Sequence, residues 1–265
     1  MEEKIIKLLF HHLDTPALAA KAARQFMNAV EATDSDEEAS ENRTPAIHPS
    51  ALSVCLRQAA MELNQIPRNS EGVPESVRKA GRIGTALHRM YQTAMKRVAK
   101  STGLFTFEYE VPLGQKGHPD VARLVLAGNA DGVFTYKDKR LGWEIKSIGG
   151  DTFKKLSDLP EKHLLQGSVY QQCLKLDAMW FMYISRDSLA IDHRVIVIPE
   201  NYWLVMRRRA STVLRHEIRD EMPPGTDFTY NCTMCSYKYC CPDPVGQSVK
   251  KEDVWRLVNQ NPTED

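Results

Sequence analysis

Two acidic residues and a lysine in the middle of the chain have a spacing that could support metal-dependent chemistry. Asp131 ends the motif GNAD, and Glu144 and Lys146 flank Ile145 in the motif EIK. Alternate side chains of a β-strand share a face, so Glu144 and Lys146 should project to the same side. If residues 137–140 form a four-residue hairpin loop, Asp131 lies opposite Lys146 and joins them on that face.

Clustered carboxylates repel each other unless a cation lies between them. Mg²⁺ and Mn²⁺ are hard divalent ions that prefer oxygen ligands, and such an ion can activate a water and hold a phosphate for in-line displacement. Lys146 would then orient or help deprotonate that water, or offset charge that develops on the phosphate. An isolated D…ExK pattern is, however, more often a solvated hairpin than a catalytic site.

Three further features favour the catalytic interpretation. The apolar run 124–127 predicts a buried strand that ends in Asp131, although an acid there is unusual. Gln166 and Tyr170 are four residues apart and would share one helix face. Gly84 lies one turn before His88 and would let another backbone approach the helix closely. Ordinary helix packing would also explain the last two features individually.

The elements that must position these residues follow from hydrophobic periodicity and from helix and turn signals. Predicted helices cover 4–31 with a break at 14–16, from Ser50 or Ser53 to 63, 75–100, 161–176 and 200–221. Predicted strands cover 105–112, 124–136, 141–148, 178–185 and 192–198. This order predicts an α/β fold with a mixed central sheet flanked by helices.

Bulk properties are those of an ordinary soluble globular protein. The chain has 265 residues, 42% hydrophobic and 26% charged, with a net charge of +1. A nucleic-acid surface would therefore need local clusters, such as Arg78, Lys79, Arg82 and Arg89, or the run 207–209, although either could be a solvated helix face. No apolar stretch approaches the ~20 residues that span a bilayer, and no signal peptide is evident, so we expect a cytoplasmic protein without a membrane partner.

The cysteines have the spacing of metal ligands. In a reducing compartment they are expected to be ligands or core residues rather than disulfides. Cys232 and Cys235 form a CxxC pair, and Cys240 and Cys241 follow five and six residues later. A closed thiolate site needs four ligands, and Cys55 is the best further donor because Cys173 falls within a helix pattern. This spacing fits zinc and an iron–sulfur cluster equally well.

Taken together, the motifs resemble the RecB-like nucleases of the PD-(D/E)XK superfamily, which include lambda-type exonucleases. Four pieces match in order across residues 84–170: Gly84…His88, Gly128…Asp131, Glu144-Ile145-Lys146 and Gln166…Tyr170. The resemblance implies a restriction-endonuclease-like core. It further implies that the metal is held by His88, Asp131, Glu144 and the main-chain carbonyl of Ile145. Lys146 would be catalytic, and Gln166 and Tyr170 would contact DNA near the scissile end.

The resemblance extends to the cysteines. One cysteine before the core and three after it is the arrangement of iron–sulfur RecB-like nucleases, such as the CRISPR-adaptation exonucleases and the AddB-type recombination nucleases. It implies a [4Fe-4S] cluster on Cys55, Cys232, Cys235 and Cys241, with the choice between Cys240 and Cys241 open and zinc as the alternative. The predicted organisation is a helical segment and acidic linker at 1–46, a nuclease domain with its cysteine clasp at 47–242, and a polar tail around one short helix at 243–265.

The expected function is a Mg²⁺- or Mn²⁺-dependent DNA exonuclease that makes single-stranded ends for recombination, repair or spacer processing, in phage or bacteria. The alternative is a non-cleaving nucleic-acid-binding or assembly subunit with the same fold. The expected partner is DNA, as single strands or duplex ends, with a recombinase, helicase or CRISPR-adaptation protein and oligomers as further candidates. Strand polarity, exo- or endonuclease mode and the pathway are left open by the sequence.

Overall fold

The structure is a computed structural model that describes residues 44–69, 73–225, 232–242 and 246–261. The predicted helices at 4–31 and the acidic linker that follows them lie outside the described residues. Five strands form one mixed sheet in the order β1-β2-β3-β4-β5, and two short strands, β6 and β7, pair separately. The strands are β1 (Thr106–Pro112), β2 (Asn129–Tyr136), β3 (Lys139–Ile148), β4 (Ala178–Ser185), β5 (Ile191–Ile196), β6 (Glu221–Met222) and β7 (Val249–Lys250).

Strands β3 and β4 run parallel, whereas the other neighbours in the five-stranded sheet are antiparallel. A parallel pair needs a crossover, and α8 (Glu161–Cys173) lies in the connection between β3 and β4. The remaining helices are α3 (Pro49–Leu52), α4 (Leu56–Leu63), α5 (Glu75–Thr102), α6 (Pro119–Arg123), α7 (Gly150–Lys154), α9 (Glu200–Ile218) and α11 (Lys251–Gln260), with 3₁₀ helices η2 (Leu113–Lys116) and η3 (Lys238–Cys240). The predicted α/β class with a mixed, helix-flanked sheet is thus confirmed.

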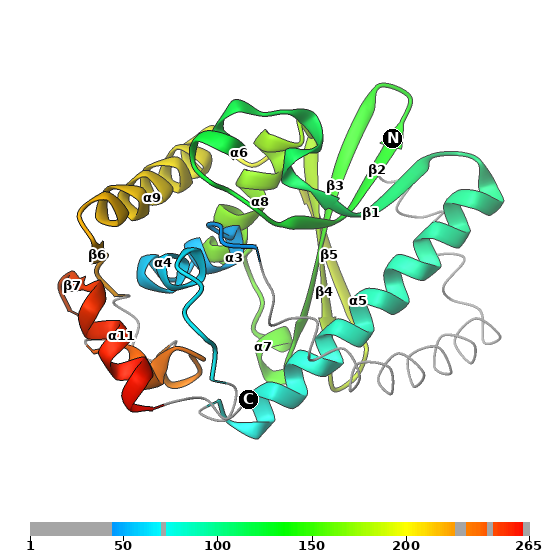
Figure 1. Cartoon of the computed structure of the whole chain (residues 1–265). Coiled ribbons are helices and arrows are strands. Elements are labelled where there is room, and N and C mark those ends of the chain that lie inside the picture. The colour runs from blue at the N-terminus through cyan, green and yellow to red at the C-terminus, as the bar shows by residue number, and fades with distance from the viewer. Residues whose placement is uncertain (1–43, 70–72, 226–231, 243–245, 262–265) are drawn as a thin grey trace.

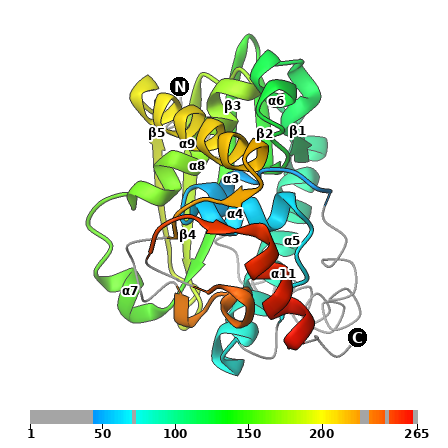
Figure 2. The ribbon, with the colours of Figure 1, turned by 60° about the vertical axis from the view of Figure 1, so that its left-hand side comes forward.

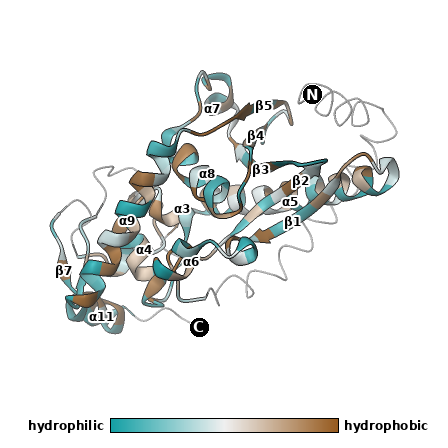
Figure 3. Cartoon of the chain, turned by 90° about the horizontal axis from the view of Figure 1, so that it is seen from above, coloured by the Kyte–Doolittle hydropathy of each residue, from teal (hydrophilic) through white to brown (hydrophobic). Residues whose placement is uncertain are grey.

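Helices cover both faces of the sheet. Figure 1 places α5 on one side and α3, α4, α8 and α9 on the other, and Figure 2 shows the second group layered together. Each layer has its own apolar core, one around Leu87, Trp143 and Trp180 beneath α5, the other around Val169 and Phe181 beneath α8. Figure 3 shows hydrophilic and hydrophobic residues alternating around α9, as expected for a helix with one buried face.

The long helix α5 carries part of the predicted site. It begins after Pro74 and ends where Gly103 adopts the left-handed conformation, with φ of 62°, that closes many helices. Leu87, Tyr91 and Met95 pack its apolar side against the sheet. The predicted helix at 75–100 therefore forms, two residues longer than expected. No helix within the described ranges is long and apolar enough to cross a membrane.

Two predicted elements differ from the structure. Residues 124–128, predicted as the start of a strand, are a loop in which Leu126 makes a single bridge to Ile47, and β2 begins only at Asn129. Leu124 and Leu126 are buried, so their apolar character reflects packing rather than strand formation. The helix predicted up to residue 63 is broken at 53–55 into α3 and α4.

The hairpin between β2 and β3 also differs from the prediction. Its turn contains only residues 137 and 138, so Tyr136 pairs with Lys139 rather than with Leu141. The register is therefore shifted by two residues. Because side chains alternate with a period of two, this shift changes the partners but leaves each side chain on the face that was expected.

The C-terminal segment, predicted as a polar tail, contributes to the folded core. β7 pairs with β6, and Val254 and Val258 of α11 are buried in the same cluster as the helices around α9. The predicted short helix is present, but its apolar side is covered. Residues 243–245 and 262–265 of this segment lie outside the described ranges.

Candidate active site

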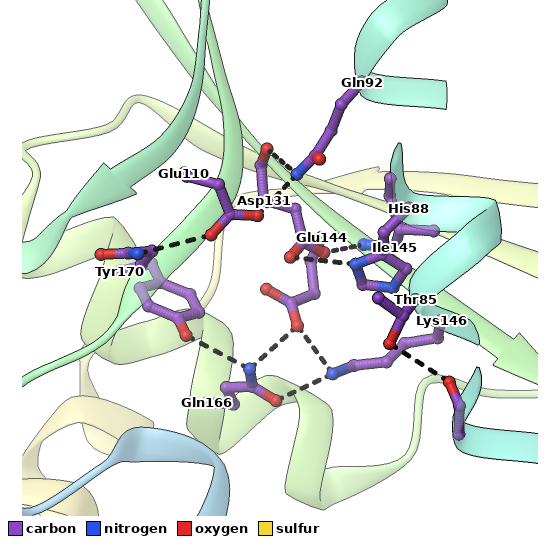
Figure 4. Close-up of polar contacts among 12 residues, drawn as sticks. Thr85, His88, Gln92, Glu110, Asp131, Glu144, Ile145, Lys146, Gln166 and Tyr170 are labelled. Carbon is purple, nitrogen blue, oxygen red and sulfur yellow. Dashed lines mark hydrogen bonds and ion pairs between the residues drawn. The ribbon is translucent and has the colours of Figure 1, made fainter. Parts of the chain in front are cut away.

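The predicted acidic residues meet where the pairing of β2 and β3 ends. The last paired residues are Gly132 and Trp143. Beyond this pair, Oδ2 of Asp131 accepts a hydrogen bond from the Ile145 amide at 2.6 Å, so a carboxylate binds an amide just past the end of the ladder. Figure 4 shows the side chains of Asp131 and Glu144 pointing toward a shared space between α5 and α8. The two carboxylates are thus brought together as predicted.

Lys146 and Glu144 form a buried ion pair that a glutamine completes. The ammonium of Lys146 lies 2.7 Å from Oε1 of Glu144 and donates a hydrogen bond to Oε1 of Gln166 at 3.0 Å. The amide of Gln166 in turn donates to Oε1 of Glu144 at 2.9 Å and contacts the Tyr170 hydroxyl at 3.3 Å. With three partners, the orientation of the Gln166 side chain is fixed, and it links α8 to β3 (Figure 4).

Helix α5 delivers His88 to the same site. Nδ1 of His88 lies 3.3 Å from Oδ1 of Asp131. One turn earlier, a methyl group at Gly84 would lie 2.9 Å from the hydroxyl of Ser147, a separation that ordinary packing does not allow. The glycine therefore permits the close approach of α5 to β3 that the sequence suggested. All four pieces of the predicted motif set converge.

The site has strongly interacting charges. The pKa of Glu144 is raised to about 7, because burial and the nearby charge of Asp131 outweigh the opposing charge of Lys146. Burial also disfavours ionised Asp131, but His88 and Lys146 outweigh this effect and hold its pKa below the usual range. The pKa of Lys146 is raised because Glu144 and Asp131 outweigh the effect of burial. Lys146 is therefore an ammonium at neutral pH.

Two functional candidates, Glu110 and Gln92, were not found by sequence reasoning. Glu110 follows Tyr109, which pairs with Gly132, and it has a φ of 51°, a conformation that residues with a side chain rarely adopt. The amide of Gln92 donates to Oε1 of Glu110 at 2.8 Å and to the carbonyl of Asp131 at 2.9 Å. Gln92 could have been noticed four residues after His88 on α5, whereas Glu110 is placed only by strand pairing.

A cavity of about 600 Å³ opens beside this arrangement. Glu110, Gly128, Asn129 and Tyr170 line it together with residues of α3 and η2. Tyr170 is only 4% exposed, so its ring is largely covered and it meets the cavity at one edge. The cavity therefore reaches Glu110 and Tyr170, which lie at the edge of the site.

The donor set fits a hard divalent cation. Oε2 of Glu144 is buried and has no hydrogen-bond partner, which is costly for a carboxylate oxygen unless a cation or proton binds it. Within the described ranges, no three His, Cys, Asp or Glu side chains are already gathered as around a metal ion. The carboxylates instead contact His88, the Ile145 amide and Lys146. Oxygen donors from Asp131 and Glu144 beside one imidazole are the chemistry that Mg²⁺ and Mn²⁺ accept.

Cys55 lies near three cysteines of the C-terminal segment, Cys232, Cys235 and Cys241. Burial, together with smaller contributions from the nearby Cys55, Cys241 and Cys232, raises the pKa of the Cys235 thiol to about 11. The pKa of the Cys232 thiol is likewise raised, first by burial and then by the nearby Cys55 and Cys241. Cys240 is buried, and its thiol donates to the Tyr237 carbonyl at 3.5 Å. This arrangement favours Cys241 over Cys240 as the fourth donor, and four thiols of this kind suit zinc or an iron–sulfur cluster.

The segments that carry these cysteines are joined by a buried arginine. Arg57, only 1% exposed, donates to the carbonyls of Pro223 and Gln247 and approaches Sγ of Cys241 at 3.4 Å. Nearby, the Asn69 amide donates to a backbone carbonyl of the CxxC segment. Cys173 lies in the core on α8, as predicted, with no exposed surface.

Comparison with known proteins gives structural likeness only. No family model and no curated protein matches the chain. Among solved structures, the protein SSO0001 is 18% identical with a TM-score of 0.49, over 84% of this chain and 97% of its own. An alkaline exonuclease, LHK-Exo from Laribacter hongkongensis, is 13% identical with a TM-score of 0.48, over 67% of this chain and 90% of its own. Its complex with dAMP is 14% identical, with a TM-score of 0.47, over 66% and 89%.

Proposed function

We propose that this chain is a Mg²⁺- or Mn²⁺-dependent deoxyribonuclease of the PD-(D/E)XK type that hydrolyses phosphodiester bonds at DNA ends. The observation that carries the proposal is the convergence of Asp131, Glu144 and Lys146 from adjacent strands, with His88 from α5. Gln166 completes the arrangement from α8. A buried pair of carboxylates next to an ammonium is costly for stability alone, and it suits a charged, metal-bound phosphate.

Each residue has a distinct role in this proposal. Asp131, Glu144 and His88 hold the cation, with the carbonyl of Ile145 as a further ligand. When bound there, the divalent ion supplies the Lewis acid that activates water and polarises the phosphate. Lys146, kept protonated by the two carboxylates, offsets charge on the phosphate rather than acting as a base. Gln166 positions Glu144 and Lys146 relative to each other.

The test separates metal binding from turnover. DNA labelled at the 5′ or the 3′ end is incubated with Mn²⁺, and Mn²⁺ binding is measured by titration calorimetry. Glu144→Gln should lose both binding and cleavage, because it removes a metal ligand. Lys146→Met should keep Mn²⁺ binding but lower cleavage at least about 100-fold, the size of effect seen when a transition-state donor is removed. The labels report strand polarity, and cleavage of circular DNA would indicate endonuclease mode.

Lys154→Met is the matched control, because Lys154 is an exposed lysine whose side chain is 80% accessible. It should leave both readouts unchanged. Full activity in both Glu144→Gln and Lys146→Met would refute the assigned site. DNA binding without cleavage by the wild-type protein in any divalent metal would instead support a non-cleaving subunit built on the same fold.

We further propose that Cys55, Cys232, Cys235 and Cys241 hold a [4Fe-4S] cluster, with zinc as the alternative. The proximity of these thiols and their CxxC spacing support a four-thiolate centre. Such a centre would join α4 to the segment that follows α9, as Arg57 already does through its hydrogen bonds. Its proposed role is structural, because it closes the chain around the nuclease core.

A further inference from the structure

The two basic clusters of the sequence lie on different helices, α5 and α9. In the run 207–209, Arg207 pairs with the buried Asp120 at 2.9 Å, and Arg209 donates to the Leu52 carbonyl at 2.7 Å. These two arginines are used within the fold. The cluster that begins at Arg78 belongs to a longer row of cations on α5, the helix that carries His88.

The row on α5 lies along one face of the helix. At about 100° per residue, positions 78, 82, 89, 96 and 100 fall within a sector of about 40°. Arg78, Lys96 and Lys100 are exposed, and Arg82 and Arg89 are half-buried. The row is about 33 Å long at 1.5 Å per residue, and His88 is level with its middle, about 100° around the helix from it. B-DNA of that length contains about ten base pairs at 3.4 Å per pair.

The charge of α5 is unusual for this chain. The helix contains seven Lys and Arg residues and one acid, Glu75, whereas the whole chain has a net charge of only +1. Glu75 pairs with Lys79, which is not part of the row. The helix that reaches the carboxylates therefore has a much higher net positive charge than the chain as a whole. A concentrated row of this kind attracts a polyanion even when the overall charge is near zero.

An exposed aromatic ring lies next to this row. Tyr109 of β1 is 47% exposed, and the ammonium of Lys96 lies 4.9 Å from the centre of its ring. An exposed tyrosine can stack on an unpaired base, and a neighbouring cation can contact the adjoining phosphate. A row of cations that can contact phosphates, next to a ring that can stack on a base, favours a nucleic-acid-binding surface over a solvated helix face.

We propose that the row formed by Arg78, Arg82, Arg89, Lys96 and Lys100 binds the phosphodiester backbone of the substrate on both sides of the scissile phosphate. Tyr109 stacks on a base of the single-stranded part. This inference rests on the proposed nuclease function, and it adds the path of the nucleic acid. The backbone follows α5, and the carboxylates meet it near His88.

The test measures binding in EDTA, where metal-dependent cleavage cannot occur. Fluorescence anisotropy gives the Kd of a labelled duplex of about 20 base pairs, and of its single strand, between about 50 and 200 mM KCl. The double variant Arg78→Gln/Lys100→Gln should weaken duplex binding. It should also reduce the slope of log K against log salt by nearly 2, since each lost phosphate contact removes about 0.9. Tyr109→Ser should weaken single-strand binding several-fold and leave duplex binding nearly unchanged.

Arg208→Gln/Arg215→Gln is the matched control, because it removes two exposed arginines from α9, which Figure 1 shows on the opposite side of the molecule. It should keep the wild-type slope. The proposal is overturned if the α5 double variant behaves like this control, or if the wild-type protein binds neither DNA. The two proposals can fail separately, because this assay measures binding alone. If the slope changes as expected but the cleavage assay detects no activity, the nuclease proposal is refuted and the α5 row remains supported as a DNA-binding surface.

Discussion

At the scale of single residues, the chemistry depends on the ionisation of Glu144. Its pKa of about 7 reflects burial beside Asp131, and its Oε2 atom has no hydrogen-bond partner. Protonation at this group therefore competes with any cation that needs both of its oxygens. Burial alone would lower the pKa of Lys146, but the nearby Glu144 and Asp131 outweigh it and keep that pKa raised.

Metal binding should therefore depend on pH. Below pH 7 a cation must displace the Glu144 proton, so Mn²⁺ affinity should rise by up to about tenfold per pH unit and level off above about pH 8. The stability of the metal-free protein should change in the opposite direction with pH. The folded-state pKa lies above the ordinary value of 4.5, so the free energy of unfolding should fall as pH rises from about 5 to 7.

Titration calorimetry and denaturant unfolding check these two trends. Glu144→Gln cannot ionise at this position, so it should flatten most of the pH dependence of unfolding in EDTA. Mn²⁺ affinity that stayed constant between pH 6 and pH 8 would contradict the assignment of Glu144 as a ligand.

Gln92 and Glu110 give a second prediction at this scale. Gln92→Ala removes the amide that joins Glu110 to the Asp131 carbonyl, and it should lower metal affinity or cleavage about 10- to 100-fold, as the loss of residues supporting metal ligands does. Gln115→Ala is the control, because Gln115 makes a similar bond to Glu108 on the exposed surface. Equal activity of the two variants would show that Gln92 has no positioning role.

At the scale of elements, close packing of helices against the sheet holds the site together. Gly167 of α8 lies between Gln166 and Tyr170, and a methyl group there would come within 2.7 Å of Phe181 and 2.9 Å of Ile198. Gly81 of α5 is also a helical glycine, but a methyl group there would meet nothing within 4 Å. The same substitution should therefore have opposite effects at the two positions.

Gly167→Ala should destabilise the protein by about 1–3 kcal/mol, because α8 must move away from β4 or the core must rearrange. Gly81→Ala should stabilise it by up to about 1 kcal/mol, through the higher helix propensity of alanine. Urea unfolding at fixed pH measures both. A stabilising Gly167→Ala would mean that α8 is not packed against the sheet as described here.

Some elements were predictable because their signal is local. The bounds of β4 match the prediction, since an unbroken run of apolar and aromatic residues at 178–185 forms a strand buried on both faces. Helices α5 and α8 both begin directly after prolines, and α5 also has clear helical periodicity. The strand predicted at residues 124–128 was wrong, because apolar residues that are buried in a loop resemble those of a strand in sequence. Val125 there has a φ of 51°, a left-handed conformation outside the extended region of regular strands.

At the scale of the whole molecule, the proposed cysteine centre would join α4 to residues 232–241. Cys55→Ser should lose the bound metal, expose this junction to limited proteolysis and lower the melting temperature. Cys173→Ala, a buried cysteine outside the group, should retain the metal. The measurements are iron and sulfide content and visible absorbance. A colourless protein with one zinc ion per chain would show that the site binds zinc instead of an iron–sulfur cluster. Full iron in Cys55→Ser would exclude Cys55 as a ligand.

Side-chain positions that depend on neighbouring residues within one strand or helix could be predicted from the sequence alone. Alternation along one strand placed Glu144 and Lys146 on a common face, and helical spacing did the same for Gln166 and Tyr170. A register error of two residues was harmless there, because side-chain direction repeats every two residues. The positions of Glu110 and Gln92 beside the site, and of Cys55 near the CxxC pair, depend on the tertiary structure. It also decided that α11 enters the core. These contacts join residues far apart in the chain, and packing of whole elements sets their geometry rather than any local pattern.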